Sequence, residues 1–255
     1  MDSQEEEIYG GFARVYDIFM DEVPYDEWYE YLSGLLRREG VSDGTVLDLA
    51  CGTGEITRRL FRSGYHVIGV DVSQEMLAVA GGKCPPDVVL LHQDMRELEL
   101  LGKVRGAVCL CDGMNYLLSE RDLAEVFART ASALEGNGVF IFDMKTSFYY
   151  REILGDSTFA DNREDVSYIW DNEYDRETGI NTYLLSVYEL VDDERDLFVR
   201  TDELHRQRAY PPGRVKELLH RSGFSAIEVY EAMTEHAPTE KSERVYFVCR
   251  RENGE

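Results

Sequence analysis

The stretch VLDLACGTGEIT, residues 46–57, joins an apolar run to a helical pattern through a bend that contains two glycines. In α/β proteins a strand–turn–helix unit of this kind often binds a nucleotide, because the backbone approaches a ligand closely at the glycines. Three ligand classes fit such a turn: a phosphate group, a dinucleotide, or another adenosine-containing molecule. The residues around Gly52 and Gly54 distinguish between them.

The turn lacks the features of a phosphate-binding loop. A Walker loop has the pattern G-x-x-x-x-G-K-[ST], which the sequence does not contain. A dinucleotide fingerprint has a third small residue at the position where this chain has Thr57. Glu55 also places a carboxylate in the first turn of the helix, where it would repel a pyrophosphate. The turn therefore favours a ligand without phosphates.

Acidic residues at the ends of three predicted strands favour S-adenosylmethionine. Asp48 precedes the turn and is well placed for an ammonium group, while Asp71 follows the turn at about the spacing of a ribose-binding acid. Asp94 and Met95 come after the third strand and can offer a carboxylate and a thioether to an adenine. Each acid can also be an ordinary cap or loop residue. Together and in sheet order, they match a ligand with an ammonium group, a ribose and an adenine but no phosphate.

Strand-like and helical patterns alternate along the first 145 residues. Near-continuous apolar strands between helices predict an α/β fold with a Rossmann-like, doubly wound and mostly parallel sheet. Three β-like runs then follow without a helix between them, which predicts an inserted antiparallel β meander over the active site, before an antiparallel last strand. The strands are expected at residues 45–50, 66–71, 88–92, 107–111, 139–144, 166–174, 180–190, 197–208, 224–230 and 244–249, with Gly136 and Gly138 ending the helix before the fifth strand.

The domain prediction is one domain over residues 1–255, with the β insertion at residues 160–210 and an N-terminal helical lid at residues 1–40. The lid is inferred from Tyr9, Phe12 and Tyr16, which recur at helical spacing near the start of the chain.

The composition restricts partners and location. Lys and Arg total 27 against 50 Asp and Glu, a net charge of −23, so nucleic-acid substrates are disfavoured. The start, MDSQEEEIYG, does not resemble a secretory signal, and no apolar run is long enough to span a membrane. Cys109 and Cys111 form a C-x-C without a second pair, which favours reduced thiols and no metal site. We expect a cytoplasmic protein without membrane partners, and its oligomeric state stays open.

Four motifs resemble those of the class I S-adenosylmethionine-dependent methyltransferases. They are D-L-A-C-G-T-G (48–54), G-V-D-V-S-Q-E-M-L (69–77), H-Q-D-M (92–95) and C-L-C-D-G-M-N-Y-L (109–117). The pattern Y-x-x-F-A-x-x-Y-D (9–17) and the β insertion narrow the resemblance to a bacterial small-molecule branch, similar in plan to sugar-amine N-methyltransferases. The resemblance implies a methyl transfer from S-adenosylmethionine, which leaves S-adenosylhomocysteine.

The resemblance also implies which residues bind the cofactor. The turn would wrap the methionine portion, Asp71 would bind the ribose, Cys111 would meet the ammonium group through its backbone, and Tyr16 would close over the cofactor. The predicted cofactor-binding residues are Tyr16, Asp48, Cys51, Gly52, Thr53, Gly54, Asp71, Val72, Met76, Asp94, Met95 and Cys111. The sugar-amine enzymes place an active-site histidine where this chain has Tyr116, which argues against an aminosugar acceptor.

Methyl transfer from a sulfonium is an in-line displacement, and a hydroxyl, thiol or carbon acceptor also needs a general base. His205 is the only histidine of the insertion, and strand alternation places it on one face with Glu203 and Gln207. Arg208 belongs to the opposite face, and a bulge at the strand end would be needed to turn it inward. We predict His205, Tyr116 and Arg208 as catalytic residues.

The function expected from the sequence is methylation of nitrogen or oxygen on a small-molecule acceptor. The alternatives are a non-catalytic S-adenosylmethionine-binding regulatory protein and an RNA or protein methyltransferase. An NAD-dependent dehydrogenase is a weaker alternative, because of Glu55 and Thr57.

Overall fold

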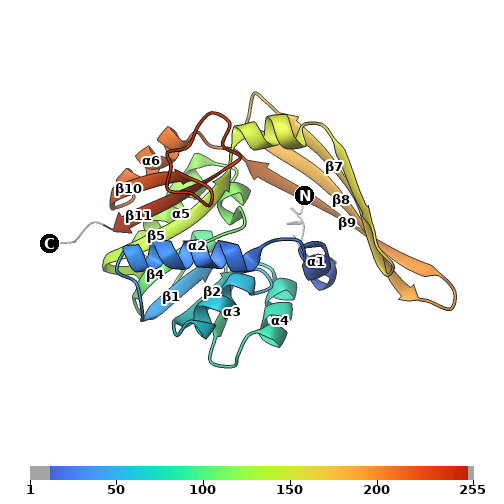
Figure 1. The fold of residues 1–255 in the computed structure, drawn as a ribbon, viewed down its shortest axis with the longest axis horizontal. Helices are drawn as coiled ribbons and strands as arrows, with labels where there is room; N and C mark the ends of the chain where they lie inside the picture. Colours follow the sequence, from blue (N-terminus) through green and yellow to red (C-terminus); the bar gives the residue numbers. More distant parts are fainter. Residues whose placement is uncertain (1–11, 252–255) are drawn as a thin grey trace, which may run out of the picture.

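Seven strands form the main sheet, in the order β10-β11-β5-β4-β1-β2-β3. The computed structural model describes residues 12–251, and Figure 1 shows their arrangement. Strands β1 to β5 run parallel, whereas β11 is antiparallel to both of its neighbours, β5 and β10. The strands are β1 (Thr45–Leu49), β2 (His66–Asp71), β3 (Val89–His92), β4 (Val104–Cys109), β5 (Leu134–Lys145), β10 (Phe224–Glu231) and β11 (Arg244–Arg251). The prediction of a mostly parallel, doubly wound sheet is confirmed.

Successive residues of the central strands enter two separate apolar cores. Val46 of β1 belongs to a core with Leu36 and Leu60, which come from α2 and α3. The next residue, Leu47, belongs to a core built with α5 and α6 on the other face. Burial on both faces explains why these strands are apolar without alternation. The helices are α1 (Ala13–Phe19), α2 (Tyr25–Arg38), α3 (Glu55–Arg62), α4 (Gln74–Lys83), α5 (Glu120–Ala133) and α6 (Pro212–Arg221).

A second sheet is antiparallel and extends away from the first (Figure 1). Its inner face carries Val166, Leu185 and Val187, which form a small core with Phe12 at the start of α1. The first helix therefore packs against the second sheet. The strands are β6 (Thr158–Asn162), β7 (Val166–Asp175), β8 (Ile180–Asp192) and β9 (Leu197–Arg208).

This sheet has four strands, where three were expected. The additional strand, β6, pairs only with β7 and lies at the edge of the sheet. Its residues alternate between half-buried and exposed, so the sequence TFADN has no apolar run to reveal it.

The fifth strand of the main sheet begins earlier than expected. Gly136 and Gly138 do not end a helix; they lie within β5, while α5 ends at Ala133. Leu134 already pairs with Val104, and a shift in register follows before Gly106. Glycines within a strand often mark a shift in the pairing register, and glycines also often end helices. The sequence alone therefore does not distinguish the two cases.

Part of the predicted lid lies outside the described residues, namely Tyr9 and the rest of residues 1–11. Among residues 12–251, no helix is both long and apolar enough to cross a membrane.

Candidate active site

The loops after β1 and β4 meet where the strand order of the main sheet reverses. The chain continues from β1 to β2 and β3 on one side, whereas β4 and β5 lie on the other. Three non-glycine residues in these loops have left-handed backbones: Ala50, Cys111 and Asp112, with φ of 52°, 61° and 58°. A Cβ on Gly113 would lie 2.9 Å from that of Ala50, so the loops are in close contact. Crevices at such reversals, beyond the carboxyl ends of strands, bind ligands in this architecture, and strained backbone gathers at such sites.

Asp71 fixes the glycine turn. Its Oδ2 accepts a hydrogen bond of 2.8 Å from the backbone N–H of Gly52, and its Oδ1 accepts one of 2.9 Å from Ser73 at the start of α4. Burial raises the pKa of Asp71, in spite of hydrogen bonds from Ser73 and Gly52 that stabilise its charge. One carboxylate thus joins the turn to the next loop of the sheet, and its contact with a ribose stays a prediction.

Asp48 lies beneath the turn and is almost fully buried. Its Oδ2 accepts a hydrogen bond of 2.6 Å from Oγ1 of Thr57, and burial raises the pKa of Asp48 to about 7. Thr57 therefore has a structural role as the hydrogen-bond donor to Asp48, which comparison with the dinucleotide fingerprint did not reveal. Contact between Asp48 and a ligand ammonium stays a prediction.

The charge of Glu55 is neutralised by three cations, which changes its interpretation. Its carboxylate forms ion pairs with Arg58, Arg59 and Lys83. Burial opposes ionisation, but these hydrogen bonds prevail and lower the pKa of Glu55 to about 2. Repulsion of a pyrophosphate by Glu55 is therefore weaker than the sequence suggested. The stronger evidence against a phosphate ligand is that the chain lacks the Walker loop and the complete dinucleotide fingerprint.

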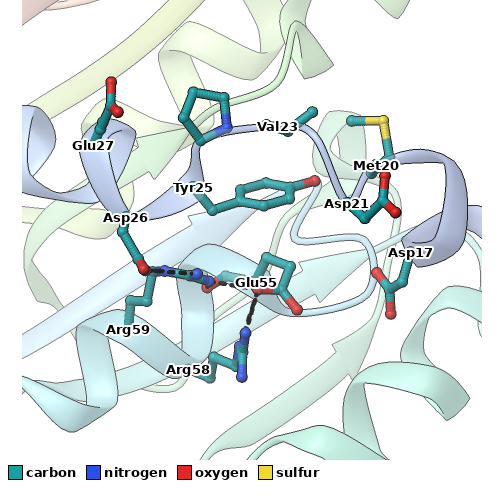
Figure 2. A pocket seen from close by; sticks show the side chains of 11 residues that line it. Asp17, Met20, Asp21, Val23, Tyr25, Asp26, Glu27, Glu55, Arg58 and Arg59 are labelled. Carbon is teal, nitrogen blue, oxygen red and sulfur yellow. Dashed lines mark hydrogen bonds and ion pairs between the residues drawn. The ribbon is translucent and has the colours of Figure 1, made fainter.

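Figure 2 shows Glu55 beside a surface pocket of about 470 Å³. Asp17 lines this pocket from α1 and Tyr25 from the start of α2, and Arg58 and Arg59 line it from α3. The predicted cofactor-binding residues do not line it. A second hollow, of about 620 Å³, borders Asp94.

The first helix is attached directly to the glycine turn. Asp17 accepts a hydrogen bond of 2.7 Å from Oγ1 of Thr53 and forms an ion pair of 2.5 Å with Lys83. Tyr16 lies one residue earlier and packs edge to face on Phe12, with 5.4 Å between ring centroids. The residue that contacts Thr53 is thus Asp17, the neighbour of Tyr16 in the chain, and closure of Tyr16 over the cofactor stays a prediction.

The residues expected around an adenine follow β2 and β3. Val72 is exposed, Met76 is buried in α4, and the carbonyl of Val72 lies 2.8 Å from Nε2 of His92. Asp94 caps the 3-10 helix η1 (Met95–Glu97) and pairs with Arg96 at 2.5 Å. The loops are adjacent, but the Asp94 carboxylate is engaged with a neighbouring cation.

A buried group of charges that sequence reasoning missed surrounds the loop after β4. Arg244 of β11 forms ion pairs with Asp112 and with Asp143 of β5. Lys145 lies 3.2 Å from Asp112, and Nε2 of Gln207 donates to Asp112 at 2.7 Å. Burial opposes the charge of Asp112, but Lys145 and Arg244 lower its pKa. Charged residues at the ends of otherwise apolar strands were the available signal.

Two of the predicted catalytic residues are in contact. Nδ1 of His205 lies 3.2 Å from the hydroxyl of Tyr116, which lies 2.9 Å from the hydroxyl of Tyr183. Nε2 of His205 lies 3.1 Å from Oε2 of Glu203. His205 and Glu203 belong to β9, Tyr183 to β8, and Tyr116 to the 3-10 helix η2 (Gly113–Tyr116) after β4. Glu203 and Tyr183 were not predicted as site residues.

Arg208 does not contact the other predicted catalytic residues in any of the interactions described for His205 and Tyr116. No bulge interrupts β9 near it, since Arg208 pairs in regular register with Ile180. Its guanidinium donates to the carbonyl of Leu118 at 2.8 Å and lies 5.0 Å from the ring centre of Tyr210. The expected inward turn of Arg208 is therefore wrong: the side chain holds the segment after η2, and its direct contact with an acceptor stays a prediction.

Comparison with known proteins identifies the family of this chain. Residues 46–138 match the family model described as a methyltransferase domain. The chain is 38% identical over 243 residues to the putative methyltransferase YqeM of Bacillus subtilis (strain 168), covering 94% of this chain and 96% of the relative. The chain belongs to the class I S-adenosylmethionine-dependent methyltransferases.

Two further comparisons concern structure and acceptor. A crystal structure of an S-adenosylmethionine-dependent methyltransferase from Clostridium acetobutylicum ATCC 824 superposes on the methyltransferase with a TM-score of 0.84, at 26% identity and with coverage of 96% and 99%. A dTDP-3-amino-3,6-dideoxy-alpha-D-glucopyranose N,N-dimethyltransferase from Streptomyces fradiae is 32% identical over 136 residues, 52% of this chain and 53% of that protein.

The residues of this methyltransferase fit the cofactor that its family implies. A Cβ on Gly52 would meet no atom within 4 Å, so open space adjoins the turn at that residue. The donors and acceptors around it are backbone groups and carboxylates, which suit an ammonium, a ribose and an adenine.

Proposed function

We propose that this methyltransferase transfers a methyl group to nitrogen or oxygen of a small-molecule acceptor. The acceptor would lie between the second sheet and the loops after β1 and β4, where the strand order of the main sheet reverses. The observation that carries the proposal is the contact between β9 and the loop after β4. Glu203, His205 and Gln207 are all buried, although they are polar; His205 contacts Tyr116 there and Gln207 contacts Asp112. Buried polar groups from two sheets at a ligand crevice are typical of a reaction site.

S-adenosylmethionine supplies a methyl group on a positively charged sulfur when it is bound. The residues of this chain hold and align the reactants, which accounts for much of the rate in such displacements. Asp71 and the glycine turn would position the ribose and methionine portions. Tyr16 on α1 would cover the cofactor, in keeping with a lid formed by the N-terminal helices. The inner face of the second sheet would exclude water from the acceptor.

A small acceptor is favoured over RNA by charge. The net charge of −23 opposes binding to a phosphate backbone. The relative from Streptomyces fradiae is named for an amino sugar acceptor, which supports a small nitrogen-containing substrate. Tyr116 in place of a histidine argues that the acceptor differs from an amino sugar. We infer a cytoplasmic enzyme that acts as one methyltransferase domain, without nucleic-acid or membrane partners.

The test combines cofactor binding with an acceptor screen. Calorimetry is expected to show S-adenosylmethionine binding, and a metabolite screen is expected to show release of S-adenosylhomocysteine with small amines or hydroxyl compounds. Asp71→Ala is expected to weaken cofactor binding at least 10-fold, because it removes a ribose acceptor and the hydrogen bonds to Gly52 and Ser73.

Asp87→Ala, in the loop before β3, is the matched control and is expected to bind as the unchanged enzyme does. Unaltered binding by Asp71→Ala, or turnover only with RNA or protein acceptors, would contradict the proposal.

A further inference from the structure

The buried contacts at β9 form a continuous chain from a carboxylate to a phenol. Glu203 contacts His205, His205 contacts Tyr116, and the distances are 3.1 Å and 3.2 Å. His205 is 1% exposed and Glu203 7% exposed, whereas Tyr116 is only half-buried. A reactant in the crevice can therefore reach Tyr116 but not His205.

The hydrogen-bond partners of Glu203 determine which nitrogen of His205 carries a proton. Oε1 of Glu203 accepts a hydrogen bond of 3.0 Å from the backbone N–H of Phe12. An ionised carboxylate can only accept, so Nε2 of His205 must donate to Oε2. In the neutral imidazole, Nδ1 then has a lone pair, which accepts the O–H of Tyr116. This direction of hydrogen bonds moves a proton from Tyr116 towards His205.

Tyr183 holds the His205 imidazole and the Tyr116 phenol in place. Its ring stacks on His205, with 4.8 Å between centroids and 11° between planes, and its hydroxyl lies 2.9 Å from that of Tyr116. Asn115 fixes the position of η2, since its side chain bonds the carbonyls of Lys145 and Arg208 and the N–H of Lys145. The phenol is therefore held at the end of β4 by contacts from both sheets.

Resting on the methyltransferase function proposed above, we propose that Tyr116 is the catalytic base, with Glu203 and His205 as positioning residues that make it one. As the acceptor atom forms its bond to the methyl carbon, the carbon–sulfur bond breaks and S-adenosylhomocysteine leaves neutral. The acceptor's proton passes to the Tyr116 oxygen, and the Tyr116 proton passes to Nδ1 of His205. The resulting imidazolium is paired with Glu203 and returns its proton to water after product release.

This chain of groups restricts the acceptor class. A proton-accepting relay is useful only when the reacting atom loses a proton on methylation. The acceptor is therefore a hydroxyl compound or an amine that arrives as the ammonium ion. Thioethers, which have no proton to give up on sulfur, are excluded as preferred substrates, and any amine acceptor must lose its ammonium proton before its nitrogen attacks the methyl carbon.

The kinetic test uses conservative variants with matched controls. Tyr116→Phe, His205→Gln and Glu203→Gln are each expected to lower kcat about 100-fold, the scale of general base catalysis, with KM changed less than about 3-fold. Tyr188→Phe and Glu189→Gln, on β8 away from this chain of groups, are expected to keep the activity of the unchanged enzyme. Calorimetry on all five variants is expected to show unchanged S-adenosylmethionine binding.

A second readout does not need an acceptor. Nitrogen-15 spectra of the cofactor-bound protein are expected to show His205 with the proton on Nε2, its signal being identified among the five histidines by its loss in His205→Gln. Glu203→Gln is expected to reduce the fraction of His205 that carries its proton on Nε2. A proton on Nδ1 in the unchanged protein, or full kcat in Tyr116→Phe, would overturn the relay while leaving the proposed function intact. Failure to bind S-adenosylmethionine would instead overturn the proposed function.

Discussion

Asp48 shows at the scale of one residue how burial changes the meaning of a charge. The sequence presents it as an anion ready for an ammonium group. The structure surrounds it with apolar strands and gives it one neutral partner, Thr57, so burial raises its pKa to about 7. Burial therefore favours the protonated form of Asp48 at pH values where an exposed aspartate is ionised. A cation bound above it would favour the charged form again.

Replacement of Asp48 by asparagine is expected to make stability less dependent on pH. The folded pKa lies above the unfolded value of about 3.9, so Asp48 weakens the fold progressively from about pH 4 to pH 7 and fully above that. The asparagine side chain is uncharged and can still accept a hydrogen bond from Thr57. Urea unfolding without cofactor is expected to show Asp48→Asn more stable by roughly 2–4 kcal/mol at pH 8, and by much less at pH 5.

A stability difference for Asp48→Asn that is the same at both pH values would contradict burial as the cause. Thr57→Val is a useful companion, because it removes the hydroxyl while Asp48 stays buried. It is expected to lower stability at pH 8 more than at pH 5, since the hydroxyl stabilises the charged form most.

At the scale of one element, α1 depends on its neighbours. A helix of seven residues is not stable alone in water. It is held by Asp17, which contacts Thr53 and Lys83, and by Phe12 and Phe19 against the second sheet. Glu203 also accepts a hydrogen bond from Phe12. Docking of this helix therefore affects the glycine turn and the proposed relay together.

Removal of the Asp17 carboxylate is expected to loosen α1. Asp17→Ala loses one hydrogen bond and one ion pair, together about 1–2 kcal/mol, so amide hydrogens of residues 13–19 should exchange about 5–30 times faster. Hydrogen exchange followed by mass spectrometry measures this directly. Glu30→Ala, on the exposed side of α2, is the control. Exchange in α1 that stays unchanged would show that aromatic packing alone holds the helix.

At the scale of the whole molecule, Arg244 joins parts that are distant in sequence. It contacts Asp143 within the main sheet and Asp112 after β4, and Asp112 in turn contacts Gln207 of the second sheet. Burial raises the pKa of Asp143 in spite of Arg244, so this carboxyl depends strongly on its partner. The group is both a support for the crevice and a link between the sheets.

Arg244→Met is expected to destabilise the protein by about 3–5 kcal/mol at pH 7.5, because the buried Asp143 loses its cation and Asp112 keeps only Lys145. The loss is expected to be smaller at pH 5 than at pH 7.5, because burial raises the pKa of Asp143 and a protonated carboxyl does not need a cation. Urea unfolding at both pH values measures it. Arg250→Met, on the same strand as Arg244, removes a partly exposed ion pair with Glu39 and is expected to change stability by less than about 1 kcal/mol. Equal losses for the two variants would contradict the importance of burial.

The fold was largely predictable because its signals are local. Apolar strands such as residues 45–50 and the glycine turn each fit within a short window, and their order implies a parallel sheet. The strand β6 was missed because an edge strand carries no apolar run. The early start of β5 was missed because its glycines lie in a strand irregularity that looks like a helix end.

The sequence by itself determined the doubly wound sheet, the methyltransferase family and the place of the glycine turn. Only the tertiary structure decided which polar groups meet: Asp48 with Thr57, Arg244 with two aspartates, and His205 with Glu203 and Tyr116. Periodicity tells which face a residue occupies, because that depends on neighbours in the chain. Ionic and hydrogen-bond partners depend on how separate elements pack, and burial then fixes the protonation state on which the chemistry relies.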